Sequence, residues 1–163
     1  MPVVPLTNDA WGFETNCFVC EPRNVTGLQI PFFADTDRDI VFADFSLSRD
    51  FSGAPMWVHG GVSLAIVDEA MAWAVIALRN RWAVTKDVTA SYHRPIEVDG
   101  AYRVEARVAA DGEQRVRTEA TILGDARQPH LSAWSEMVVY SAVKAPDMLG
   151  VDVPDELRGY LDQ

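Results

Sequence analysis

The stretch WVHGGVSLAIVDEAMAW, residues 57–73, is an apolar segment that glycines open and two adjacent carboxylates interrupt. Alanine, leucine and methionine are strong helix formers, and cations at 79 and 81 suit a helix C-terminus, so we expect a helix from Gly60 to Arg79. It would be about 30 Å long and, being apolar nearly all round, buried on most faces. Carboxylates inside such a helix, here Asp68 and Glu69, are usually functional or specifically paired.

Length and composition limit the class of protein. The chain has 163 residues, 48% hydrophobic and 23% charged, which predicts a single globular domain with a leader at 1–26 and an acidic tail at 144–163. A formal charge of −10 repels phosphates, so we expect neither a nucleic-acid nor a membrane partner. The start of the chain has no secretory signal pattern, and the apolar run at 62–78 is short for a bilayer span, so the predicted location is cytoplasmic.

The other segments read as strands. Alternation of apolar and polar residues, separated by Asp-Gly and Gly-Asp turn signals at 99, 111 and 124, predicts an antiparallel meander after the helix. Two earlier runs are short, apolar and bounded by turn residues, and residues 49–58 read as a loop. The fold class is therefore α+β, with the sheet wrapped around the helix. The expected strands are 27–35, 39–47, 83–95, 101–110, 114–124 and 130–141, and a short helix is expected at 155–161.

Two cysteines, Cys17 and Cys20, form the one Cys-x-x-Cys of the chain. A structural zinc would need two more ligands from His59, His93 or His130, and none of these has a supporting spacing. The cysteines also lack the strand that precedes a redox dithiol. We expect two packed thiols and no metal.

These elements and the motif HGGVSLAIVDEA resemble the hotdog-fold acyl-CoA thioesterases, the branch of the phenylacetate-pathway and 4-hydroxybenzoyl-CoA enzymes. In that branch an acid follows the His of His-Gly-Gly by nine residues, which here is Asp68 after His59. The leader NCFVCEPRNVTGLQI and the strand VTKDVTASYHRP are similar too, so the resemblance covers 17–141. It implies a hotdog fold, with an antiparallel sheet around one long helix, and a homodimer whose pairing into tetramers stays open.

The chemistry of a thioesterase can be argued from these residues. Hydrolysis puts negative charge on a carbonyl oxygen, and the N–H groups at Gly60 and Gly61 open the helix where such charge is stabilised. Asp68 would act as base or as nucleophile, which the sequence leaves open. Asp68 is favoured over Glu69 because it lies nearly two turns after Gly61 on the same face, whereas Glu69 is rotated by about 100°. The alternative is a tight helix entry with paired structural carboxylates.

Other site residues follow from the resemblance. The family pattern places a Ser or Thr seven residues before the strand tyrosine, here Thr85, to hold water or the carboxylate; ordinary strand propensity is the alternative. The loop before the helix often carries Asn or Gln near the thioester carbonyl, where this chain has Ser52 and Gly53. His59 is a candidate for catalysis or for a local hydrogen bond. The coenzyme A phosphates need a basic patch, and Arg94 is one of five candidates, with Arg79, Arg81, Lys86 and His93.

We therefore expect an acyl-CoA thioesterase with no cofactor besides the coenzyme A of its substrate. Gly60 and Asp68 are eight residues apart, roughly 12 Å of helix, so one helix cannot supply both groups to one thioester. A site shared between two subunits is expected. Two alternatives remain: an acyl-CoA-binding or regulatory module without catalysis, and a hotdog dehydratase or hydratase, which needs a catalytic His. The acyl group is not specified.

Overall fold

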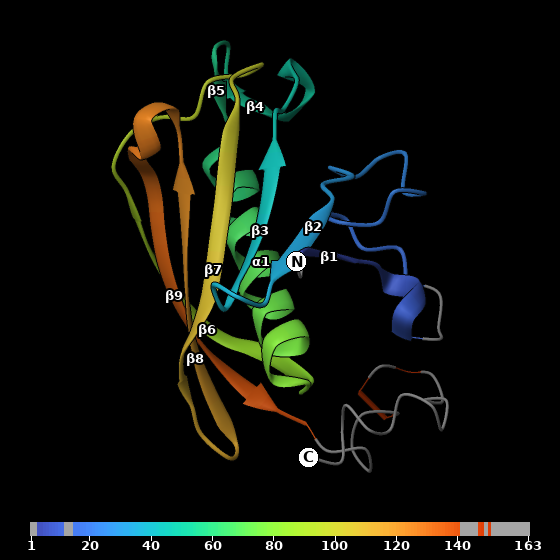
Figure 1. Cartoon of the computed structure of the whole chain (residues 1–163). Helices are drawn as coiled ribbons and strands as arrows, with labels where there is room; N and C mark the ends of the chain where they lie inside the picture. The colour runs from blue at the N-terminus through green and yellow to red at the C-terminus, as the bar shows by residue number, and fades with distance from the viewer. Residues whose placement is uncertain (1–2, 12–14, 141–146, 149, 151–163) are drawn as a thin grey trace.

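A computed structural model describes residues 3–11, 15–140, 147–148 and 150, and shows one curved antiparallel sheet around a long helix (Figure 1). Two small strands form a separate hairpin before the helix. The predicted α+β hotdog fold is confirmed. The elements are β1 (Val3–Leu6), η1 (Asn8–Trp11), β2 (Phe32–Asp35), β3 (Ile40–Phe45), η2 (Arg49–Phe51), β4 (Ser52–Ala54), β5 (Trp57–Val58), α1 (Gly60–Arg79), β6 (Ala83–Tyr92), β7 (Tyr102–Asp111), β8 (Arg115–Leu123), η3 (Asp125–Arg127) and β9 (Pro129–Val139).

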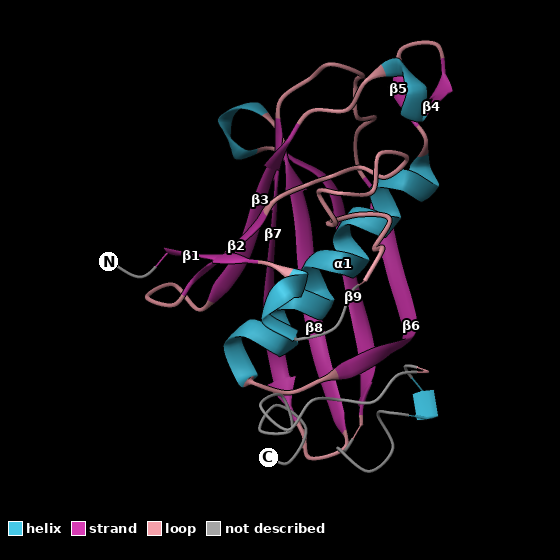
Figure 2. Ribbon diagram, turned by 90° about the vertical axis from the view of Figure 1, so that its right-hand side faces the viewer, coloured by secondary structure: helices cyan, strands magenta, loops and turns pink. Residues whose placement is uncertain are grey.

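Helix α1 has the bounds expected from the sequence. His59 caps its N-terminus, and Asn80, in the left-handed conformation at φ 53°, ends it. The helix is long and apolar enough to span a membrane by length and composition, but its apolar side chains belong to the hydrophobic core. The helix itself lies against the concave face of the sheet (Figure 2). Its buried residues are Ser63, Ile66, Val67, Ala70, Met71, Trp73, Ala74 and Val75.

The order of the sheet corrects the predicted meander. The strands are arranged β1-β2-β3-β7-β8-β9-β6, so β7, β8 and β9 form a meander but β6 pairs with β9 and lies at the edge. The turn at Asp99-Gly100 therefore belongs to a long connection and joins no hairpin. Local turn residues predict a reversal of the chain, whereas the neighbour of a strand depends on how the whole sheet covers the helix.

Three further differences concern short elements. Residues 49–58, expected as a loop, contain the hairpin of β4 and β5. Strand β1, which has a proline and only four residues, was not predicted and pairs with β2. Alternation is confirmed in β8, where every second residue from Val116 to Ile122 is buried. The helix expected at 155–161 lies outside the described residues.

The described leader, residues 15–31, shares the hydrophobic core with the helix and lies over α1 (Figure 2). Two backbone hydrogen bonds hold its turns, from Leu28 N to Phe18 O at 2.8 Å and from Ile30 N to Val19 O at 2.9 Å. The Glu21 side chain is only 2% exposed and accepts from the Arg23 guanidinium at 2.6 Å, which holds the pKa of that carboxyl at about 2. Hydrogen bonds and an ion pair therefore hold the described leader in one conformation on the domain.

Candidate active site

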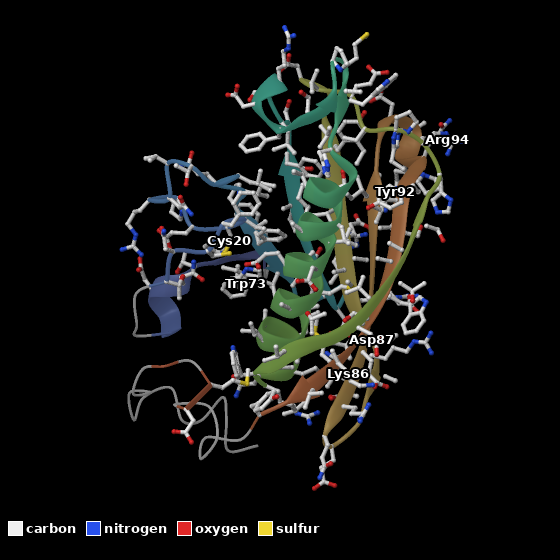
Figure 3. The ribbon with its side chains drawn as sticks, turned by 180° about the vertical axis from the view of Figure 1, so that it is seen from behind. Cys20, Trp73, Lys86, Asp87, Tyr92 and Arg94 are labelled. Atoms are coloured by element: carbon white, nitrogen blue, oxygen red, sulfur yellow. The ribbon has the colours of Figure 1, made fainter. Side chains whose placement is uncertain are left out.

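Edge strand β6 runs antiparallel to α1 and touches it through polar side chains at two places. Near the start of β6, Thr85 meets Asp68; at its end, Tyr92 meets Gly60. Figure 3 shows Tyr92 at one end of this strand and Lys86 with Asp87 at the other. Asp68 and Gly60, both predicted as site residues from the sequence, thus lie beside opposite ends of one strand.

The first group is the Asp68–Thr85 pair. The Thr85 hydroxyl donates to Asp68 Oδ1 at 2.7 Å. Both residues are partly buried, so the carboxylate is oriented by the hydroxyl and still reachable. The register of β6 against β9 shifts between Thr85 and Asp87, a β-bulge beside this contact. Bulges of this kind re-aim a side chain next to a site.

The second group is the N-terminus of α1. His59 Nδ1 accepts from the Gly61 N–H at 2.9 Å, so the histidine acts as a cap and already occupies that donor. Within the described residues, no acceptor is found for the Gly60 N–H. Tyr92 donates its hydroxyl to Gly60 O at 2.8 Å. Gly60 is therefore the free donor at the positive end of the helix dipole.

An open groove passes this helix end. It has a volume of about 330 Å³. Ser63 from the first turn of the helix and Arg94 from the segment after β6 both line it. Neither Ser63 nor Tyr92, which also lines the groove, was predicted as a site residue from the sequence. The signal that could have pointed to Tyr92 was the strand tyrosine of the family pattern, seven residues after Thr85. The lining residues are Val58, Gly60, Ser63, Tyr92, His93, Arg94, Pro95 and Ile96.

The five basic candidates for phosphate binding differ in their partners. Arg79 and Arg81 are ion-paired with aspartates at 2.7 and 2.5 Å, and Lys86 pairs with Glu136 at 3.1 Å. His93 faces the Ser132 hydroxyl at 3.0 Å. Arg94 donates to the Pro129 carbonyl oxygen at 2.9 Å, and among the described residues it forms no ion pair. Its charge remains available to a phosphate at the groove.

Glu69 and Ser52 lie elsewhere. Glu69 faces the leader, where Cys17 Sγ lies 3.3 Å from its Oε1, whereas the Thr85 hydroxyl bonds Asp68. Burial, followed by the charge of Cys17, raises the pKa of Glu69 to about 8. Ser52 lies in β4 opposite Val58, in the hairpin before the helix, and does not line the groove. The structure thus brings Asp68 to Thr85 and separates both from Glu69.

Comparison with known proteins gives a partial family match and a shared fold. Residues 57–126, from β5 before the helix into the short turn η3 after β8, match the family model "Thioesterase superfamily". No curated protein matches the sequence significantly. Similar solved structures share the fold. A thioesterase superfamily protein is 22% identical with a TM-score of 0.71 over 80% of this chain, and this chain spans 64% of its length.

Two other structures add named proteins. The Escherichia coli PaaI protein of the phenylacetic acid degradation operon is 16% identical, with a TM-score of 0.63 over 70% of this chain and 81% of its own. A hypothetical thioesterase of Streptococcus pneumoniae TIGR4, solved with coenzyme A, is 17% identical, with a TM-score of 0.58 over 61% of this chain and 77% of its own. Variants of that protein with one aspartate or one threonine replaced by alanine also match. The family model covers 70 of the 163 residues, and the solved structures, each below 25% identity, share the fold. Both findings agree with the resemblance to the hotdog-fold thioesterases.

Proposed function

We propose that this protein is an acyl-CoA thioesterase in which Asp68 is the catalytic carboxylate. The observation that carries the proposal is the 2.7 Å hydrogen bond from Thr85 to Asp68 Oδ1. It fixes one oxygen and leaves the other to take a proton from water or to attack the thioester. Water and acyl-CoA then yield a carboxylic acid and free coenzyme A, with the thiol taking the proton. No further reactant is needed.

The oxyanion donor in this proposal is the Gly60 N–H at the start of α1. A tetrahedral intermediate carries its charge on the former carbonyl oxygen, and an unpaired N–H at a helix N-terminus stabilises that charge. The neighbouring Gly61 N–H is held by His59, which sets the entry of the chain into the helix. His59 is thus a positioning residue in this proposal, and Ser52 supports the hairpin that precedes it.

The site is shared by two subunits in this proposal. One helix holds Gly60 and Asp68 about 12 Å apart, too far for both to reach one thioester. Strand β6 has a free edge in the seven-stranded order. If two copies of β6 pair antiparallel about the midpoint between Val88 and Thr89, Tyr92 of one copy lies opposite the partner's Thr85. Each Gly60 then approaches the partner's Asp68, which gives two equivalent sites per homodimer.

Arg94 is the proposed contact for coenzyme A. It lines the groove that contains Gly60, and its guanidinium has no carboxylate partner among the described residues. Guanidinium groups bind phosphates through paired donors. A coenzyme A complex of one structural neighbour, and an acetyl-CoA complex of another from Streptococcus mutans UA159, support this class of ligand.

The experiment is a hydrolysis screen with the reduced, full-length protein. A short panel of aliphatic and aromatic acyl-CoAs is incubated with it, and released coenzyme A is read with a thiol reagent after subtraction of a blank for the protein's own thiols. We expect catalytic turnover on at least one member, and a rate lower by about 100-fold or more with Asp68→Asn. Binding of the acyl-CoAs without turnover on any member would favour the binding-module alternative, because such a module needs no carboxylate.

A further inference from the structure

Two cysteines of the leader and one glutamate of the helix form a cluster that the proposed hydrolysis does not use. Cys17 and Cys20 lie in the turn before β2, and Glu69 projects toward them from α1; Figure 3 labels Cys20 beside Trp73, one turn further along the helix. The two sulfur atoms and a carboxylate oxygen all lie within 4.8 Å of one another. No histidine has a spacing that would complete a zinc site with the two cysteines, but the fold brings a carboxylate to them, Glu69, from 52 residues after Cys17.

We propose that Cys17, Cys20 and Glu69 bind one zinc-class divalent cation. Zinc bonds of about 2.3 Å to sulfur and 2.0–2.2 Å to oxygen place tetrahedral ligand atoms roughly 3.5–3.8 Å apart. The distance from Cys17 Sγ to Glu69 Oε1 is 3.3 Å, so the three atoms need to shift by only about 1 Å around a cation. Thiolates select zinc over magnesium or calcium, and a water molecule completes the fourth position.

The turn around the cysteines is already shaped to hold anionic sulfur. The backbone N–H groups of Val19 and Cys20 both donate to Cys17 Sγ at 3.4 Å. The side-chain amide of Asn8 lies 3.5 Å from Cys20 Sγ. Donors on the ligand sulfur stabilise the deprotonated form that a metal needs and fix its direction. A pair of thiols that merely fills space has no need of three such donors.

The charges of the cluster point the same way. Within the part of the chain that the structure describes, Glu69 forms no ion pair with Lys, Arg or His. Negative groups gathered in a partly buried place repel one another unless protons or a cation compensate. A bound cation displaces those protons and removes the repulsion.

Such a cation would tie the leader to the middle of α1. Its ligands come from the segment before β2 and from the helix turn that also carries Asp68. The cation is a structural clamp in this proposal, because the adjacent Asp68 faces Thr85 and no ligand reaches the groove. It does not depend on the proposed hydrolysis, and the two can fail separately.

The test is a metal titration of the chelator-stripped protein, kept reduced with a phosphine so that no disulfide forms. Co²⁺ is the probe, because tetrahedral cobalt bound to thiolates absorbs strongly in the visible and near ultraviolet. We expect one Co²⁺ per chain with a thiolate band, displacement by Zn²⁺, and a Zn²⁺-dependent rise in melting temperature. A folded, reduced wild-type protein that gives no thiolate band would overturn the proposal.

Variants assign the ligands. Glu69→Gln should weaken Co²⁺ binding at least about 100-fold, more than the loss of an outer contact does, and Cys17→Ser with Cys20→Ser should abolish the band. The matched control is Asp68→Asn, the neighbouring carboxylate, which should keep full cobalt stoichiometry and affinity. Unchanged binding by Glu69→Gln would remove the carboxylate from the site and overturn the three-ligand proposal. If the cysteine variant does not fold, the wild-type titration and the glutamate variant still decide.

Discussion

Asp68 and Glu69 are neighbours in sequence, yet they belong to two different regions of the molecule. The Asp68 side chain faces edge strand β6 and accepts from Thr85, whereas Glu69 faces the leader and meets Cys17. A helix turns by about 100° per residue, so consecutive positions look toward different neighbours. A pair of carboxylates in one motif can therefore serve two unrelated purposes, which in our proposals are hydrolysis and metal binding.

Asp68→Asn should have the largest effect on catalysis. The substitution keeps shape and removes the acid, so kcat on the best acyl-CoA should fall by about 100-fold or more. Glu69→Gln should lower kcat by less than about tenfold, since it does not touch the Thr85 side. Steady-state hydrolysis of both variants measures this. The reverse ranking would move the catalytic role to the leader side of the helix.

Thr85→Val tests whether the hydrogen bond from Thr85 to Asp68 contributes to catalysis. Valine keeps the strand and the volume but removes the donor to Asp68, so the carboxylate loses its orientation. We expect kcat to fall by about tenfold with KM nearly unchanged, as for a positioning residue. Thr85→Ser is the matched control and should retain most activity. Equal losses in both variants would indicate packing rather than the hydroxyl.

Arg94→Ala should act on binding and leave the chemistry alone. Loss of one unpaired guanidinium at the groove should raise KM for acyl-CoA several-fold, with little change in kcat. This rise corresponds to about 1 kcal/mol of lost binding free energy. Added salt should narrow the difference from wild type, because screening weakens the same charge. Lys86→Ala, which removes an ion-paired lysine, is the control. If both substitutions raise KM equally, the phosphates do not bind Arg94 specifically, and the positive charge of the surface as a whole accounts for the effect.

Tyr92→Phe is expected to have the smallest effect. It removes only the hydrogen bond to Gly60 O from a side chain that is 55% exposed. The free energy of unfolding should fall by about 0.5–1.5 kcal/mol, measured by urea denaturation. No change in stability, together with a clear loss of kcat, would place the hydroxyl in the reaction instead of the helix entry.

The sequence predicted local elements well and nonlocal ones poorly. Both ends of α1 were predicted because the glycines at its start and the cations at its end are local signals. Strand β6 was placed wrongly in the meander because its partner β9 begins 37 residues after β6 ends, and turn residues carry no information about such a pairing. Strand β1 was missed since four residues with a proline give almost no period.

The candidate site shows the same division. The positions of Asp68 and Thr85 came from the resemblance, and their contact joins residues 17 apart in sequence. The partners of Glu69 could not be predicted, because they depend on how the leader docks on the helix. Tyr92 is the strand tyrosine of the family pattern, but its hydrogen bond to Gly60 O could not be predicted, because it depends on how β6 lies antiparallel along α1. Helix phase separates the two carboxylates, and tertiary packing decides what each one meets.

The proposed site is built from two subunits. Gly60→Pro removes the N–H, and His59 at ψ 132° already has the backbone conformation that a following proline requires. Gly60→Ala is the matched control, because its Cβ would lie 3.5 Å from the Tyr92 ring, an ordinary contact, and it keeps the N–H. Each of Gly60→Pro and Asp68→Asn alone should be inactive, and Gly60→Ala should remain active.

The deciding measurement is hydrolysis by Gly60→Pro and Asp68→Asn after the two are unfolded and refolded together in equal amounts, with a mass tag on one chain. Random pairing makes half of the dimers mixed, and each mixed dimer has one intact site of two, so about a quarter of wild-type activity should return. Mixed dimers that are verified by mass and remain inactive would contradict a shared site.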